Sequence, residues 1–306
     1  MKPLPQVKDD AHQSMETARK QRTIGRPAAV AGFGYWSGRD VRLEFHPAEP
    51  GTGIVFVRRD LEGCPRIPAG IRYRVEIARR STLQCDGAGV EMVEHALAAL
   101  AGLSIDNCEI RLDAAELPGL DGSAQPFVEV LDAAGIVEQN AWRPRRVVRE
   151  TIRLGDERSW IEARPLTSPA PVLSYELDYG PQSPIGRQAL HVVLTPQSFR
   201  AELAASRTFL LKSEADALRA QGIGRRATAR DLLVFGDDGP IDNRQRFPDE
   251  CVRHKLADMV GDLALAGCDL VGQFHACRSG HRLNAELVRA LVPPGEQSVL
   301  NWRRCA

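Results

Sequence analysis

Residues 248–262, PDECVRHKLADMVGD, combine the apolar spacing of an amphipathic helix with a row of charged side chains. At about 100° per residue, one arc of this helix is apolar: Val252, Leu256, Met259, Val260 and Leu263. On the opposite side, His254, Asp258 and Asp262 follow one another at intervals of four residues. We therefore predict a long helix over residues 248–266, with one face packed in a core and one polar face.

The polar face of this helix has two interpretations. A histidine and a carboxylate four residues apart can bind the same Zn²⁺ ion because their side chains lean toward each other, and His254 and Asp258 have that spacing. The alternative is a solvated polar contact on a helix surface. A metal site therefore needs a third ligand elsewhere in the chain.

His95 is the candidate third ligand. It follows Glu94 in a short helical segment, VEHALAAL, at residues 93–100. Three protein ligands leave one position of zinc open for water, and a carboxylate beside the ligands can accept the proton of that water. The alternative is that Glu94 and His95 are exposed on the polar side of an alanine-rich helix.

A further histidine, His281, follows Gly280 at the start of another predicted helix, over residues 280–291. The N-terminus of a helix disfavours a positive charge, so a protonated His281 needs a carboxylate such as Asp262 beside it. The alternative is a surface histidine near the helix cap.

The composition is that of a globular protein without a dominant charge. Of the 306 residues, 43% are hydrophobic, and 40 basic side chains balance 40 acidic ones. The chain is long enough for two domains, and its neutral balance predicts no binding to nucleic acid and no stable insertion into a membrane. Residues 1–21 are polar and lack the apolar core of a secretory signal, so we expect a flexible N-terminal tail on a cytoplasmic protein.

The order of the predicted elements indicates an α+β fold in two halves. In the first half, strand-like runs at residues 40–60 and 106–113 alternate with helical segments at residues 91–102 and 123–135. The polar segment at residues 138–148 is the candidate boundary. Beyond it, strand-like runs (146–154, 159–166, 171–179 and 189–195) precede helices (196–204, 213–221, 248–266 and 280–291). These limits give domain I at residues 22–140, domain II at residues 145–295 and a C-terminal tail at residues 296–306.

Four segments together resemble one enzyme family. They are VEHALAALAGLSIDNCEIRLDAAELPGLDGSAQPFVEVLDAAGI (93–136), SRTF (206–209), FPDECVRHKLADMVGDLALAG (247–267) and SGHRLN (279–284). From about Gln21 to about Val292 the chain resembles the UDP-3-O-acyl-N-acetylglucosamine deacetylases, zinc amidases of lipid A biosynthesis. The resemblance implies two similar α+β domains, each a sheet with helices, packed so that the helices lie between the sheets and the site lies in the interdomain cleft.

The same resemblance implies a zinc centre and a reaction. His95, His254 and Asp258 would hold one catalytic Zn²⁺, with Fe²⁺ as an alternative ion, and Glu94 would be the general base. The expected reaction removes the N-acetyl group from a UDP-linked, 3-O-acylated N-acetylglucosamine and releases acetate. We expect the protein to act as a monomer.

The resemblance also implies roles for residues around the metal. Thr208 and His281 would stabilise the oxyanion, and His281, held charged by Asp262, would donate a proton to the leaving amine. The expected substrate-binding residues are Phe209 against the sugar ring, and Lys255 and Arg278 at the diphosphate.

Two regions depart from the family pattern, and both concern the substrate. The family turn G-x-G-L-H-x-G reads GFGYWSG here, with Tyr35 and Trp36 in place of leucine and histidine. The segment at residues 209–235, which in the family builds an apolar passage for the acyl chain, carries several cations: Lys212, Arg225, Arg226 and Arg230. Cations in the passage would favour an unacylated or differently acylated N-acetyl sugar as substrate; alternatively, the basic side chains point outward and only their stems line the passage.

Overall fold

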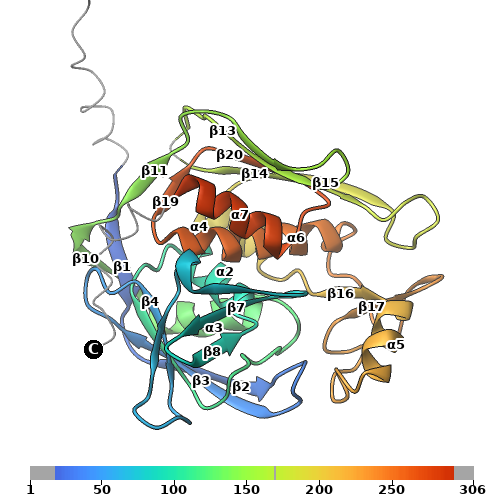
Figure 1. Cartoon of the computed structure of the whole chain (residues 1–306), viewed down its shortest axis with the longest axis horizontal. Helices are drawn as coiled ribbons and strands as arrows, with labels where there is room; N and C mark the ends of the chain where they lie inside the picture. Colours follow the sequence, from blue (N-terminus) through green and yellow to red (C-terminus); the bar gives the residue numbers. More distant parts are fainter. Residues whose placement is uncertain (1–17, 169, 293–306) are drawn as a thin grey trace, which may run out of the picture.

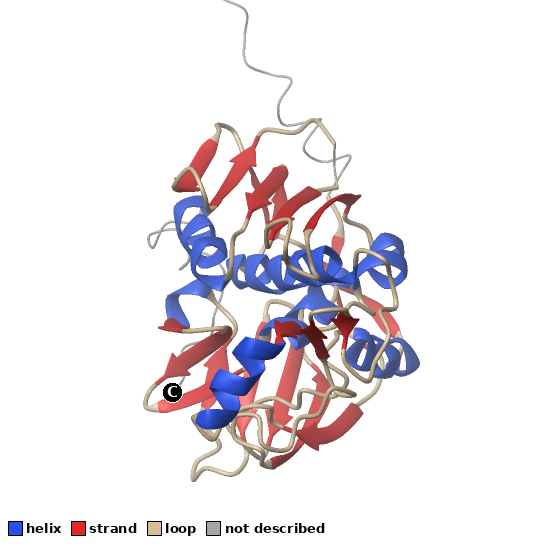
Figure 2. Cartoon of the chain, turned by 90° about the vertical axis from the view of Figure 1, so that its right-hand side faces the viewer, coloured by secondary structure: helices blue, strands red, loops and turns tan. Residues whose placement is uncertain are grey.

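The structure is a computed structural model that describes residues 18–168 and 170–292. Figure 1 shows two sheets on the outside, with helices α2, α3, α6 and α7 in layers between them, and the turned view in Figure 2 shows the same layering. The predicted mixed α+β class is thus confirmed. The C-terminal tail predicted at residues 296–306 and residues 1–17 of the N-terminal tail lie outside the described residues.

The first five-stranded sheet has the order β2-β3-β9-β4-β5. Its strands are β2 (Ala28–Phe33), β3 (Asp40–Pro47), β4 (Ile54–Arg58), β5 (Arg66–Pro68) and β9 (Cys108–Leu112). Strands β4 and β9 are parallel, and the other neighbours are antiparallel. Helices α2 (Glu94–Gly102) and α3 (Gln125–Ala134) belong to this half of the chain.

The second five-stranded sheet has the order β12-β13-β20-β14-β15. Its strands are β12 (Ile152–Gly155), β13 (Trp160–Arg164), β14 (Val172–Asp178), β15 (Arg187–Val193) and β20 (Gln273–Cys277). Only the β14–β20 pair is parallel among the described neighbours of this sheet. The two sheets therefore share a strand order: β9 lies between β3 and β4 in the first sheet, and β20 lies between β13 and β14 in the second. Helices α6 (Glu250–Leu263) and α7 (His281–Leu291) pack with this sheet.

Helices α2 and α6 pack closely in the middle of the molecule. Gly261 permits this approach, because a Cβ atom there would lie 2.1 Å from the carbonyl oxygen of Glu94. The predicted apolar arc of α6 is buried: Val252, Leu256, Met259, Val260 and Leu263. Its polar arc is buried as well, since His254, Asp258 and Asp262 are 4%, 3% and 0% exposed. The solvated-face interpretation of this helix is therefore wrong.

Two small three-stranded sheets extend the halves. One contains β6 (Arg74–Ile77), β7 (Arg80–Cys85) and β8 (Ala88–Glu91). The other contains β16 (Phe209–Leu211), β17 (Leu233–Gly236) and β18 (Gly239–Pro240), and helix α5 (Lys212–Ala220) packs on it. Figure 1 shows β16, β17 and α5 projecting at one end of the molecule.

The segment predicted as a domain boundary is largely strand. Strand β10 (Ile136–Trp142) pairs with β1 (Lys20–Ile24), and β11 (Arg145–Val147) pairs with β19 (Asp269–Val271). These are two-stranded ribbons with partly exposed faces, so their polar composition resembles that of a loop. The helix predicted at residues 91–102 begins at Glu94, because strand β8 occupies the residues before it.

Candidate metal centre and catalytic cleft

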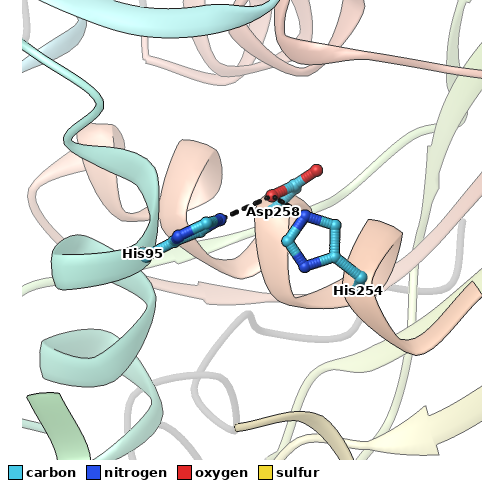
Figure 3. Close-up of side chains that lie close together, drawn as sticks. All are labelled: His95, His254 and Asp258. Carbon is cyan, nitrogen blue, oxygen red and sulfur yellow. Dashed lines mark ion pairs between the residues drawn. The ribbon is translucent and has the colours of Figure 1, made fainter. Parts of the chain in front are cut away.

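The three predicted metal ligands lie together where α2 meets α6 (Figure 3). One ligand atom from each of His95, His254 and Asp258 lies within 4.8 Å of the others. Asp258 Oδ1 is 3.6 Å from His95 Nε2 and 3.4 Å from His254 Nε2. His95 is 5% exposed and Glu94 is 3% exposed, so the alternative that places them on a solvent-facing helix surface is wrong.

Neighbouring groups orient these ligands as a metal site requires. His254 Nδ1 lies 3.2 Å from the carbonyl oxygen of Ser206, which leaves Nε2 for an ion. Lys255 Nζ donates to Asp258 Oδ2 at 2.7 Å, which leaves Oδ1 on the side of the imidazoles. Two imidazoles and one carboxylate are a common ligand set for catalytic zinc. The residues present therefore fit a Zn²⁺ ion.

The protonation states of two ligands also suit a metal ion. Burial lowers the pKa of His254 to about 4, so that its imidazole is neutral at pH 7. Burial opposes the charge of Asp258, but the neighbouring imidazoles and the Lys255 ammonium hold its pKa well below the usual range. A neutral imidazole and an ionised carboxylate are the forms that bind Zn²⁺.

Glu94 lies beside the ligands with its carboxylate buried. Its Oε2 accepts the backbone N–H of Ser81 at 3.0 Å. Burial raises the pKa of Glu94 above the ordinary value for a glutamate. A carboxylate with a raised pKa is a better proton acceptor at neutral pH than an exposed one.

His281 forms an ion pair with the completely buried Asp262, with Nδ1 2.8 Å from Oδ2. Burial opposes protonation of His281, but the Asp262 carboxylate outweighs it and raises the pKa of His281 to about 9. The imidazole is therefore protonated at pH 7. Asp262 also accepts hydrogen bonds from Ser81 Oγ at 2.6 Å and Asn284 Nδ2 at 2.8 Å, so His281 is not a free surface histidine.

A cavity of about 960 Å³ joins these groups. Nine of the ten predicted site residues line it: Glu94, His95, Thr208, Phe209, His254, Lys255, Asp258, Arg278 and His281. The tenth, Asp262, is completely buried and reaches the cavity through His281. One cleft thus contains the metal ligands, a carboxylate with a raised pKa and a protonated histidine.

Some predicted substrate contacts are occupied by other partners in this structure. The Thr208 hydroxyl donates to the carbonyl oxygen of Gly122 at 3.1 Å, and the Lys255 ammonium is bound to Asp258. Phe209 meets Tyr179 and His254 edge to face. Arg278 is exposed at the cavity lining.

The segment at residues 209–235 presents mainly apolar side chains to the cavity: Leu210, Ala215, Leu218, Ile223, Ala227, Leu232 and Val234. Among the described lining residues, none is one of the four cations singled out in the sequence. Lys212 pairs with Asp216 at 2.6 Å, and Arg226 pairs with Asp40 at 2.7 Å and lies over the ring of Phe33. For Lys212 and Arg226 this geometry favours the interpretation in which the basic side chains point away from the passage, whereas Arg219 of the same segment does line the cavity.

Tyr35 and Trp36 also line the cavity. Tyr35 donates its hydroxyl to the carbonyl oxygen of Asp231 at 2.6 Å and thereby joins the first half of the chain to the segment at residues 209–235. The guanidinium of Arg80 lies 4.2 Å from the centre of the Trp36 ring. The two aromatic residues, which replace the leucine and histidine of the family pattern, therefore make the wall of the cavity bulky.

Three residues near the site were not identified from the sequence. Asn284 is part of the SGHRLN segment. It lies one helical turn from His281, and this spacing could have identified it from the sequence. Ser81 and Tyr179 carry no such signal, because only the folded strands bring them to α6 and to Phe209.

This cleft defines a class of protein. Two histidines and an aspartate that fit Zn²⁺, beside a buried carboxylate and open to a cavity, are the arrangement of a zinc hydrolase. Within the described residues, no helix has the length and apolar content to cross a membrane.

The particular family follows from the sequence comparisons. Residues 21–293 match the profile of the LpxC family, UDP-3-O-acyl N-acetylglycosamine deacetylase. The UDP-3-O-acyl-N-acetylglucosamine deacetylase of Thermosynechococcus vestitus is 40% identical over 90% of this chain and 95% of its own. The enzymes of the same name from Psychrobacter cryohalolentis and Brucella ovis are 39% and 37% identical, over 90% and 89% of this chain and 87% and 95% of their own. The chain belongs to this family of zinc-dependent deacetylases.

Proposed function

We propose that this protein removes the N-acetyl group from UDP-3-O-acyl-N-acetylglucosamine, giving the free amine and acetate, in lipid A biosynthesis. One observation carries the proposal: a single cavity of about 960 Å³ contains the three metal ligands, Glu94 and an apolar wall from residues 209–235. The metal ligands and Glu94 suit amide hydrolysis, and the apolar wall suits an acyl chain.

His95, His254 and Asp258 would hold the Zn²⁺ ion. A Zn²⁺ ion in this position supplies a Lewis acid that polarises a carbonyl and lowers the pKa of water. Glu94 would take the proton from the water that attacks the acetyl carbonyl, because its carboxylate lines the cavity next to His95 and burial raises its pKa.

His281 would stabilise the oxyanion and then protonate the leaving amine. Its position in the cavity and its ion pair with Asp262 support this role, because the pair holds the imidazole protonated. The Thr208 hydroxyl would turn from the carbonyl oxygen of Gly122 and donate to the same oxyanion.

The remaining site residues would bind the substrate. Phe209 would pack on the sugar ring, and its place in the cavity beside His254 supports this assignment. Lys255 and Arg278 would meet the diphosphate as cations. For Lys255 this contact competes with its present ion pair to Asp258.

We also propose that residues 22–140 and 145–295 are two similar domains with their helices packed between the sheets. The shared strand order of the two five-stranded sheets supports this division. We further propose a cytoplasmic monomer that binds a UDP-linked acylated amino sugar and neither nucleic acid nor a membrane core. The equal numbers of acidic and basic residues support the part of this proposal that concerns nucleic acid.

The experiment compares two substrates. The purified, zinc-loaded protein is incubated with UDP-3-O-acyl-N-acetylglucosamine and with plain UDP-N-acetylglucosamine, and the free amine is measured. We expect amine release from the acylated sugar and far less from the plain one, because only the acylated sugar has an acyl chain that can pack against the apolar wall. Release from the plain sugar alone would overturn the proposal and assign the same chemistry to an unacylated substrate.

A further inference from the structure

We infer that Ser81 is a positioning residue that holds Glu94 and the His281–Asp262 pair in a fixed arrangement across the two halves of the chain. Ser81 belongs to β7 in the first half and is 0% exposed. Its backbone N–H donates to Glu94 Oε2 at 3.0 Å, and its hydroxyl donates to Asp262 Oδ1 at 2.6 Å. One residue thus contacts the proposed base, Glu94, and the carboxylate that holds the proposed acid, His281.

The contact to Asp262 is the one that a side-chain substitution can test. Asp262 Oδ2 accepts from His281 and Asn284, each at 2.8 Å, whereas Oδ1 accepts from the Ser81 hydroxyl. Because Asp262 is completely buried, an oxygen that loses its donor must shift or remain unsatisfied. The first outcome moves the carboxylate that holds the His281 ring, and the second destabilises the ionised form of that carboxylate.

Ser81 acts through Asp262 and does not itself line the cavity among the described residues. Its contact also crosses the boundary between the halves, since β7 belongs to the first half and α6 to the second. A shift of β7 against α6 would therefore break the contact between Ser81 and Asp262. This inference rests on the proposed function, in which both groups act on the same amide.

The chain provides a matched control one residue away. Thr82 is 2% exposed, and its hydroxyl has no hydrogen-bond partner among the described residues. Thr82→Val removes a buried hydroxyl from the same strand and keeps the branched shape. Ser81→Ala removes the hydroxyl that binds Asp262 and keeps the backbone N–H that binds Glu94.

The test measures kcat and KM for amine release from the acylated UDP sugar, together with zinc content. For Ser81→Ala we expect kcat to fall about 10- to 100-fold while KM stays within about threefold and zinc stays bound. Ser81→Cys, which keeps the size and a weak donor, should lie between Ala and wild type, and it serves as the test if Ser81→Ala does not fold. Thr82→Val should keep kcat within about twofold.

A double variant distinguishes positioning from a general loss of stability. In a His281→Ala background, Ser81→Ala should add little further loss, because its effect passes through Asp262 to His281. An equal additional loss there, or a Ser81→Ala or Ser81→Cys enzyme with the kcat of wild type, would overturn the inference. A wild-type enzyme that releases no amine would instead overturn the proposed function.

Discussion

At the residue scale, Glu94 is the group on which the proposed reaction depends most. Substituting Glu94 by Gln keeps the shape of the side chain but removes the proton acceptor, so we expect kcat to fall about 10²- to 10⁴-fold. Zinc content should remain at the wild-type level, because Glu94 is not one of the three residues whose ligand atoms converge. Full turnover with bound zinc would rule out Glu94 as the base.

The His281–Asp262 pair predicts a pH dependence. The pKa of His281 is raised to about 9, so the protonated form persists at neutral pH and is lost as the pH rises through about 9. Its contribution to folding stability is complete below the unfolded value of about 6.5 and disappears over the same alkaline range. We expect kcat to fall above about pH 9.

The carboxylate of Asp262 is the cause of this raised pKa, and its removal supplies the check. In Asp262→Asn the alkaline limb of the kcat profile should move down by at least about 1 pH unit. Wild type and variant are compared between pH 6 and 10, a range that includes both the ordinary histidine pKa of about 6.5 and the raised pKa of His281 of about 9. An unchanged alkaline limb would show that another group controls it.

The site residues could be predicted from sequence where spacing and resemblance pointed the same way. His254 and Asp258 are one helical turn apart, and the adjacent Glu94 and His95 lie in a segment that resembles the family. Ser81 and Tyr179 could not be predicted, since their contacts form only when strands from distant parts of the chain come together. The outward direction of Arg226 depends likewise on Asp40, which lies 186 residues earlier in the chain.

At the element scale, the contact between α2 and α6 controls the distance between the metal ligands. Alanine normally stabilises a helix interior relative to glycine by about 1 kcal/mol. At position 261, however, the added Cβ would lie 2.1 Å from the carbonyl oxygen of Glu94. We expect Gly261→Ala to lower the free energy of unfolding by about 1–3 kcal/mol and to weaken zinc binding.

Urea denaturation and zinc content measure this effect. Gly89→Ala is the matched control, because the nearest atoms to its added Cβ lie at 3.4 Å or more. That variant should bind zinc like wild type. A Gly261→Ala protein that is more stable than wild type would contradict the close packing of the two helices.

The elements were predictable where one periodicity dominated. Helix α6 could be predicted from its apolar arc. Its end could be predicted from Gly267, which adopts φ 69° just past the final turn at Ala264–Ala266. Strand β10 was not predictable, since a ribbon with exposed faces needs few apolar residues. Strand β11 was predicted only in part, because the strand-like run at residues 146–154 includes its last two residues. Their pairing partners, β1 and β19, are remote in the chain.

At the scale of the whole molecule, the metal ligands come from both halves of the chain, so zinc should stabilise their association. An ion present at about 100 times its Kd adds about 2.7 kcal/mol of stability. For a chain of this size, chelation should therefore lower Tm by about 3–5 °C, and added Zn²⁺ should restore it. His95→Ala is the control, because its Tm should respond little to a chelator.

The class and the family were accessible from the sequence, whereas the direction of the cations along residues 209–235 required the fold. The sequence left open whether Lys212, Arg225, Arg226 and Arg230 line the passage. Their absence from the described cavity lining depends on α5 and on pairs such as Lys212–Asp216. The fold therefore supports an acyl chain in the cavity.

Acetate release during zinc titration is the most direct measurement of the central claim. Metal-free protein is titrated with Zn²⁺, and acetate release from UDP-3-O-acyl-N-acetylglucosamine is followed. We predict that activity rises in proportion to bound zinc and reaches a plateau at about one ion per chain, as three protein ligands with one open position require. Zinc binding at that ratio without any acetate release from this substrate would contradict the account.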